Sequence, residues 1–98
     1  MRSDDPARME QMRTWLRQVA AALDLDPRLV LDHEEELLGL VAAVAHGPTR
    51  PGAPLTAFLV GVAAGRGAEV PPLTARVAAL VDEGDWPEAR RQVRPTSR

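Results

Sequence analysis

Apolar residues recur at helical spacing through most of the chain. Between residues 9 and 23 they follow one another every three or four positions, with charged and amide side chains between them. The same spacing returns at 37–45, 55–65 and 73–81. No segment alternates apolar and polar side chains as a half-buried strand would. The pattern predicts main helices at about 6–23, 32–46, 54–65 and 70–84.

Within each predicted helix, the spacing indicates which residues face inward. In the second main helix the predicted apolar face is Leu37, Leu38, Val41, Val44 and Ala45. In the last one it is Leu73, Val77, Leu80 and Val81.

Capping residues mark the starts of two of these helical segments. Asp26 before Pro27 is a typical N-cap and first-turn pair, which predicts a short helical turn. Asp32 with Glu35 three positions later resembles a capping box and predicts the start of the second main helix.

Glycine and proline mark the helix ends. Gly47 before Pro48 is expected to end the second main helix, and Gly84 the last one. Beyond Gly84, Asp85 and Glu88 are expected to cap a final short turn, with Trp86 closing over one end of the core.

The segment 55–65 is apolar on nearly every side, because Thr56 is its only polar side chain. Such a helix is usually central in its domain, and this one is shorter than the about 20 residues that span a bilayer. Gly61 and Gly65 belong to a stripe of small residues, which predicts close packing of another helix within the fold, a dimer contact being the alternative. Gly61→Leu is therefore expected to overpack this contact, at a cost of about 1–3 kcal/mol.

With 98 residues, 45% of them hydrophobic, the chain has the length of one modest domain. We expect an all-α protein: a compact bundle of four main helices with short extra helical turns, forming a single domain over 6–93. Trp15 is expected to be an anchor in the core or at its rim. Residues 1–5 are expected to be disordered. Residues 94–98 are expected to form a basic flexible tail, with docking to an acidic partner as the alternative to simple solvation.

Charge and composition exclude several classes of function. The formal net charge of −2 argues against non-specific nucleic-acid binding, and the segment 54–65 offers no Arg, Asn or Gln that would read base edges. The absence of cysteine excludes disulfides and thiolate chemistry. The polar N-terminus and amphipathic first helix lack the pattern of a signal peptide, so we expect a cytoplasmic protein that is not bound to a membrane.

The loop before the segment 54–65 is the best candidate for a binding site. His46, Arg50 and Thr56 lie close in sequence around a helix start, and three prolines between them stiffen the loop. Free amides at the helix start, an arginine fork and a hydroxyl would together bind a phosphate or a carboxylate. The structural alternative has Arg50 bonding loop carbonyls and His46 capping its own helix.

No catalytic constellation is evident, and the chain lacks the glycine-rich motifs of nucleotide-binding enzymes. We therefore expect a protein that is not an enzyme and carries no cofactor, although a small enzyme using His46 and Arg50 stays open. His33 with Glu34–Glu36 would be the only metal-site candidate. Adjacent helix positions point in different directions, so stabilisation of the helix start is preferred and no metal site is expected.

The stretch AHGPTRPGAPLTAFLVGVAAG (residues 45–65) resembles a small, uncharacterised helical domain of actinobacteria. That domain occurs alone or at the C-terminus of molybdenum cofactor guanylyltransferases, the enzymes that make molybdopterin-guanine dinucleotide. The resemblance begins at Trp15, passes through 23–27 and becomes vague after Val70. The matching residues in its densest part are His46, Gly47, Arg50, Pro51, Pro54, Leu55, Thr56, Phe58, Leu59, Gly61 and Gly65.

The resemblance implies a non-catalytic accessory or binding module in molybdenum cofactor biosynthesis. Guanylyl transfer itself is not implied, because 98 residues leave no room for a nucleotidyltransferase domain in this chain. The expected partners are proteins of that pathway or a phosphate-bearing small molecule held by His46, Arg50 and Thr56. The alternative is a homodimeric protein-interaction module unrelated to the cofactor, and the chain is expected to be a monomer or a homodimer.

Overall fold

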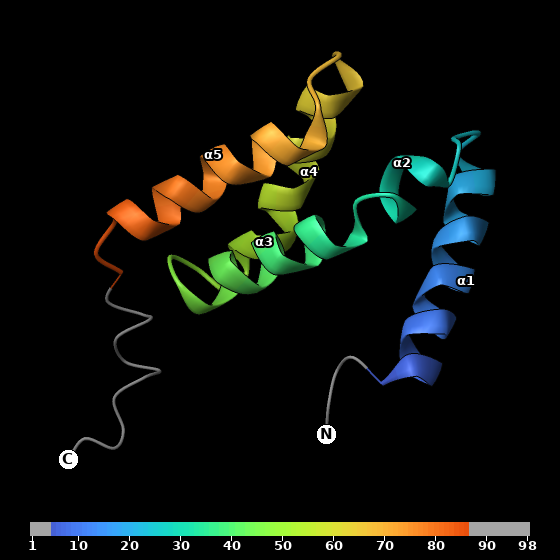
Figure 1. The fold of residues 1–98 in the computed structure, drawn as a ribbon, viewed down its shortest axis with the longest axis horizontal. Coiled ribbons are helices and arrows are strands. Elements are labelled where there is room, and N and C mark those ends of the chain that lie inside the picture. Colours follow the sequence, from blue (N-terminus) through green and yellow to red (C-terminus); the bar gives the residue numbers. More distant parts are fainter. Residues whose placement is uncertain (1–4, 87–98) are drawn as a thin grey trace. The chain divides into compact units, whose positions relative to one another are not determined.

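The computed structural model of the protein describes residues 5–86, which form five helices and no strand (Figure 1). These are α1 (Pro6–Ala22), α2 (Arg28–Leu31), α3 (Glu34–His46), α4 (Gly52–Gly65) and α5 (Val70–Glu83). The all-α prediction is confirmed: the four long helices lie within about two residues of their predicted ranges, and α2 is the short extra turn. The predictions for residues 1–4, for Glu88 and for the tail at 94–98 lie outside the described residues.

The chain divides into two compact units, one up to Glu34 and one from Glu35 onward. The single domain expected over 6–93 stays a prediction. In the first unit, the Asp5 carboxylate accepts a hydrogen bond from the Ala7 amide and caps the start of α1. At the other end, Asp24 adopts a left-handed conformation with φ of 61°, and the Leu25 amide donates to the Ala20 carbonyl at 2.8 Å. This pairing closes the last turn of α1.

Trp15 is 61% exposed, so its expected role as an anchor in the core or at its rim is wrong. The partly buried side of α1 carries Met9, Met12, Leu16 and Val19 instead. Trp15 lies beside this stripe rather than within it.

Asp26 binds the start of α2 as predicted, although the helix begins at Arg28 and Pro27 holds the N-cap position. Asp26 Oδ1 accepts a hydrogen bond from the Arg28 amide at 3.0 Å, and the Arg28 guanidinium also binds this carboxylate. The hydrogen bond from the Arg28 side chain is the main reason that the pKa of Asp26 lies below its usual value. The predicted capping box is wrong, because Asp32 ends α2 instead of starting α3 and makes no hydrogen bond to Glu35 in the described residues.

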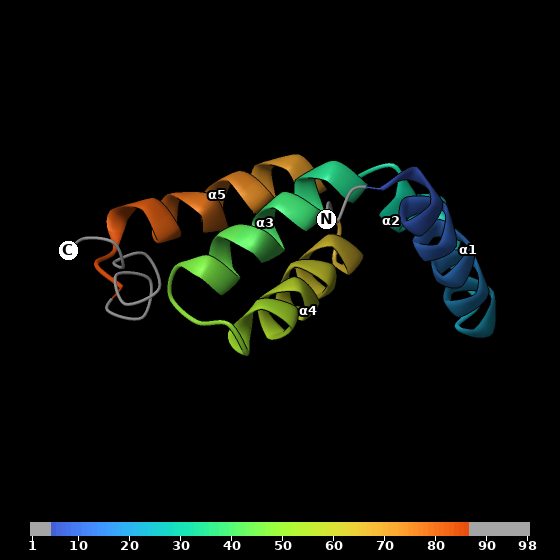
Figure 2. The ribbon, with the colours of Figure 1, turned by 90° about the horizontal axis from the view of Figure 1, so that it is seen from below.

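In the second unit, three helices share one core. Leu40 and Val44 of α3 and Ala53 and Val60 of α4 are buried. The residues packed around them are Leu37, Val41, Ala45, Leu73, Val77 and Val81. In Figure 2, α3 and α5 lie alongside each other and α4 forms a separate layer beneath them. All three helices therefore meet along the side of α4 that faces this pair.

Two predicted core positions are wrong. Leu38 is 45% exposed, and the buried leucine of α3 is Leu40, which was not assigned to the apolar face. Leu80 of α5 is 63% exposed. In both helices the surface that contacts the core is narrower than the run of apolar residues, so the spacing alone did not identify its centre.

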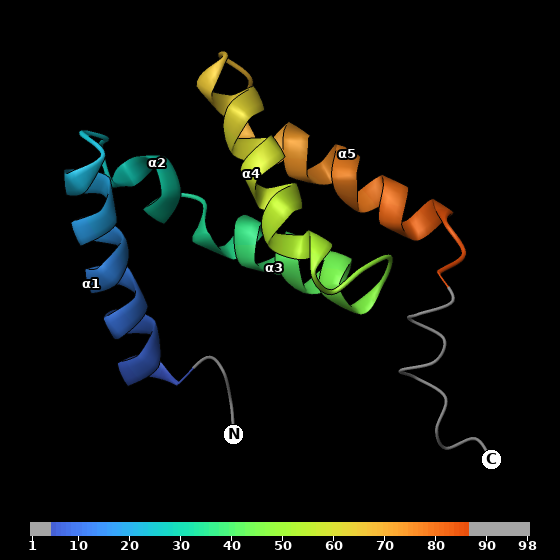
Figure 3. The ribbon, with the colours of Figure 1, turned by 180° about the vertical axis from the view of Figure 1, so that it is seen from behind.

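Within the second unit, the close packing predicted along Gly61 and Gly65 of α4 is not found, and its central place in the whole domain stays a prediction. Only Ala53 and Val60 of this helix are buried, whereas Leu55 and Phe58 are 67% and 68% exposed. A Cβ added at Gly61 would have no neighbouring atom within 4 Å. Figure 3 shows α4 in front of α3 and α5, with no helix of the same unit over its outer side. Within the second unit, α3 and α5 therefore cover only one side of α4.

Candidate functional site

The α3–α4 loop lies close against α5. The amides of Gly47 and Thr49 both donate to the Val44 carbonyl, at 3.2 and 3.1 Å, and this ends α3. Gly47 is buried, and a Cβ at this position would lie 2.8 Å from the Ala43 carbonyl oxygen and 3.1 Å from Val81 Cγ1. Only glycine fits here without a shift of the backbone, so the loop is held close to the last turns of α5.

Thr49 stabilises the start of α4. Its Oγ1 accepts a hydrogen bond from the Gly52 amide at 3.2 Å, and the Ala53 amide donates to the Arg50 carbonyl at 3.2 Å. The helix therefore begins at Gly52, two residues before the predicted start at Pro54. A threonine three residues before a first-turn amide is a recognisable capping signal, and the sequence interpretation missed it.

The three predicted site residues have different surroundings. His46 is exposed, and its Nδ1 lies 2.8 Å from the Ala42 carbonyl oxygen, so the ring interacts with the end of its own helix. Arg50 is exposed and makes no hydrogen bond or ion pair in the part of the chain that the structure describes. Thr56 is partly buried and donates to the Gly52 carbonyl at 2.9 Å. The structural alternative thus fits His46 but not Arg50.

A groove of about 530 Å³ runs between α4 and α5. Thr56, Leu59 and Ala63 line it from α4, and Val77 and Leu80 line it from α5. Its volume lies within the range of about 300–1,000 Å³ that is typical of ligand sites, which are also mainly apolar. The groove is open to solvent on the Leu80 side, because that leucine is largely exposed.

The α3–α4 loop and Trp86 close one end of this groove. Pro48 and Thr49 line it from the loop. The indole Nε1 of Trp86 donates to the Val81 carbonyl at 2.8 Å, which holds the partly buried ring against the end of α5. Trp86 therefore lies at one end of the core, as the sequence predicted.

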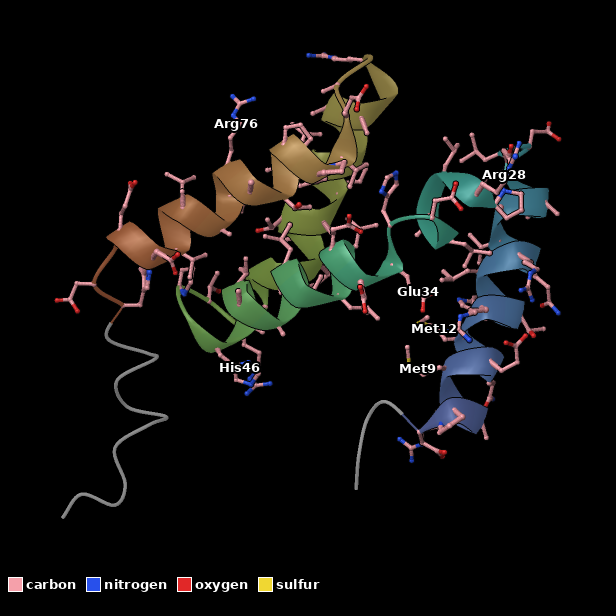
Figure 4. All side chains as sticks on the ribbon, in the orientation of Figure 1. Met9, Met12, Arg28, Glu34, His46 and Arg76 are labelled. Carbon is pink, nitrogen blue, oxygen red and sulfur yellow. The ribbon has the colours of Figure 1, made fainter. Side chains whose placement is uncertain are left out.

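Few polar groups line the groove. The hydroxyls of Thr49 and Thr56 are two of them, and Arg76 is the only charged residue among its lining residues. In Figure 4 the Arg76 side chain extends away from α3 toward solvent. The groove therefore suits a mainly apolar ligand with one anionic or carbonyl group near the α5 side.

Of the predicted site, only Thr56 lines the groove; His46 and Arg50 do not. Figure 4 shows His46 on the side of α3 that faces away from α5. The sequence interpretation did not assign Thr49, Leu80 or Arg76 to a site. Leu80 could have been found from the sequence. It belongs to an apolar stripe on the last helix that is wider than the surface this helix presents to the core.

The acidic cluster at the start of α3 contains an ion pair within the first unit. The Arg13 guanidinium binds the Glu34 carboxylate, with Nη2 2.8 Å from Oε2. This bonding lowers the pKa of Glu34 below its usual value. Figure 4 shows Glu34 beside Met9 and Met12 of α1. Within residues 5–86 no group of three or more His, Asp or Glu side chains is placed to hold a metal ion.

Fold and groove together define a small all-helical domain with an apolar groove beside a capped loop. Residues 7–92 match the family described as a domain of unknown function, DUF6457, and the chain belongs to this family. No curated protein and no solved structure matches the chain. The family description names no activity and no partner, so the link to molybdenum cofactor biosynthesis rests on the resemblance alone. None of the helices within 5–86 combines the length and apolarity needed to cross a bilayer.

Proposed function

We propose that this chain is a non-catalytic binding module that takes an apolar segment of a partner protein into the α4–α5 groove. The observation that carries the proposal is the groove itself, with its apolar walls and a single charged lining residue. Amphipathic helices bind in grooves of this kind through apolar side chains spaced three or four residues apart. The Arg76 guanidinium would then pair with a carboxylate at the edge of such a segment.

The partner that we propose is a protein of molybdenum cofactor biosynthesis, first of all a molybdenum cofactor guanylyltransferase. Support for this choice comes from the resemblance in the stretch 45–65, whose residues Pro48, Thr49 and Thr56 line the groove. The exposed guanidinium of Arg50, next to the groove-lining Thr49, would add a contact to a phosphate or carboxylate of the partner complex.

The two tryptophans allow a direct test. Trp86 lines the groove and Trp15 belongs to the other unit, so Trp15→Phe leaves Trp86 as the single reporter. Purified guanylyltransferase from the same organism is titrated into this variant. Binding in the groove should shift the Trp86 emission to shorter wavelength, because the partner displaces water from the indole.

Two variants with similar exposure provide the control. Leu80→Asp places a charge in the groove and should abolish the shift, whereas Leu29→Asp in α2 should not. Leu80 and Leu29 are 63% and 61% exposed, so neither change disrupts a core. Absence of binding would overturn the cofactor link, and equal binding by both variants would overturn the role of the groove. Arg50→Ala, compared with Arg66→Ala, tests the loop in the same titration.

A further inference from the structure

Trp86 forms the end wall of the α4–α5 groove, where α5 and the α3–α4 loop meet. Its indole Nε1 donates to the Val81 carbonyl at 2.8 Å, so the ring folds back along the last turn of α5. A Cβ added at Gly47 would lie 3.7 Å from Trp86 Cδ1, which places the ring beside the loop as well. The indole therefore closes the groove beyond Val81.

Gly84 makes this position of the indole possible. A Cβ added at Gly84 would overlap Cζ2 and Cε2 of the Trp86 ring. The φ of Gly84 is −92°, which any residue adopts, so it is the space for the ring that requires glycine here. A side chain at this position would push the indole away from the end of the groove.

The length of the groove limits what it can hold. On α5 its lining residues run from Leu73 to Val81, which corresponds to about 12 Å of helix. A partner helix that lies along the groove places residues i, i+4 and i+7 over about 10.5 Å, so three apolar side chains fit. A fourth at i+11 needs about 16.5 Å, and it would collide with the Trp86 ring or project past Leu73.

We infer that Trp86 is the specificity-determining residue of the groove and that Gly84 is the residue that positions it. Together they restrict the partner segment to about two helical turns with three apolar side chains. This inference rests on the proposed function of the groove, and it adds the length of the segment that the groove accepts.

Two helical peptides built from Ala, Glu and Lys measure this restriction by isothermal titration calorimetry. One carries leucines at i, i+4 and i+7, and the other adds a fourth leucine at i+11. Wild type should bind both with affinities within about twofold, whereas Trp86→Ala should bind the four-leucine peptide about tenfold more tightly, because a further leucine is then buried. The control Trp15→Ala, in the other unit, should behave as wild type.

Gly84→Ala should act through Trp86. It should produce the same preference for the longer peptide as Trp86→Ala, and it should add nothing when Trp86 is already alanine. In a Trp15→Phe chain it should also shift the Trp86 emission to longer wavelength, because the ring is displaced into water. Gly39→Ala should do neither, since Gly39 is exposed and a Cβ there meets no atom within 4 Å. An unshifted emission would contradict the positioning role of Gly84.

Leu80→Asp separates this inference from the proposed function. It should abolish binding of both peptides, because Leu80 lines the groove. If it does, but the fourth leucine strengthens binding to wild type as much as to Trp86→Ala, the length restriction is overturned and the groove remains a binding site. If wild type binds neither peptide, or if Leu80→Asp binds them as wild type does, the inference and the role of the groove are overturned together.

Discussion

Arg13 binds both carboxylate oxygens of Glu34: Nε donates to Oε1 at 3.0 Å and Nη2 donates to Oε2 at 2.8 Å. This two-pronged geometry joins α1 to the first residue of α3 across 21 positions of sequence. Arg13 also reaches Glu10 on its own helix at 3.3 Å. A lysine keeps the positive charge but has no planar fork that matches a carboxylate. Arg13→Lys should therefore lower the melting temperature measured by circular dichroism, whereas Arg8→Lys on the same helix should not.

The same pair predicts a pH dependence. Hydrogen bonding from Arg13 is the main cause that lowers the pKa of Glu34 from its usual value near 4.5. A carboxyl whose pKa is lower in the folded chain stabilises the fold above its unfolded pKa. That contribution is lost as the pH falls through the folded pKa. The melting temperature of Glu34→Gln should thus lie below wild type at pH 7 and converge with it in acid.

Glu35→Gln is the matched control for this pH series, because the structure shows no ion pair or hydrogen bond of the Glu35 side chain within residues 5–86. Its melting temperature should follow wild type at every pH. A gap between Glu34→Gln and wild type that stays constant down to strong acid would contradict the assignment of this ion pair.

The buried leucine of α3 gives a third prediction. Leu40 is 4% exposed and lies in the core with Val44, whereas Leu38 is 45% exposed. Leu40→Ala should lower the free energy of unfolding by about 2–5 kcal/mol, as is usual for a buried leucine. Leu38→Ala should cost well under half as much. Urea denaturation of the two variants decides between them, and equal losses would mean that both side chains are buried in solution.

These two leucines also show what could be predicted from the sequence. Helical spacing and capping residues located the long helices, because hydrogen bonding and cap chemistry are local. The spacing did not identify the inward side of α3, since Leu37, Leu38, Leu40 and Val41 are all apolar. Which side of α3 faces inward depends on the helices that pack against it. The local sequence pattern carries no information on those helices.

The candidate site shows the same division. Local chemistry predicted that His46 would interact with its own helix end, and the structure has this contact. The groove required Leu59 of α4 and Leu80 of α5 to come together, although they are far apart in sequence. The sequence could not show that Thr56 lines an apolar groove and that Arg50 does not, because this depends on how α4 packs against α5.

A fourth prediction concerns the loop that contacts α5. A methyl group at position 47 would lie 2.8 Å from the Ala43 carbonyl oxygen and 3.1 Å from Val81 Cγ1. Gly47→Ala should lower the free energy of unfolding by about 1–3 kcal/mol, the usual cost of overpacking. Gly39→Ala is the control, because that position is exposed and a Cβ there meets no atom within 4 Å. A Gly47→Ala chain as stable as wild type would show that the loop does not approach α5 this closely.

Gly61 of α4 gives the opposite expectation. The sequence alone predicted that a larger side chain would overpack a helix contact, but Gly61 is exposed and the space around it is open. Glycine inside a helix costs about 0.5–1 kcal/mol relative to alanine, because it loses more backbone freedom on folding. Gly61→Ala should therefore raise the free energy of unfolding by about this amount, and Gly61→Leu should not lower it. Urea denaturation measures both changes. A loss of 1 kcal/mol or more for Gly61→Leu would mean that another part of the chain covers this side of α4, as the small-residue stripe first suggested.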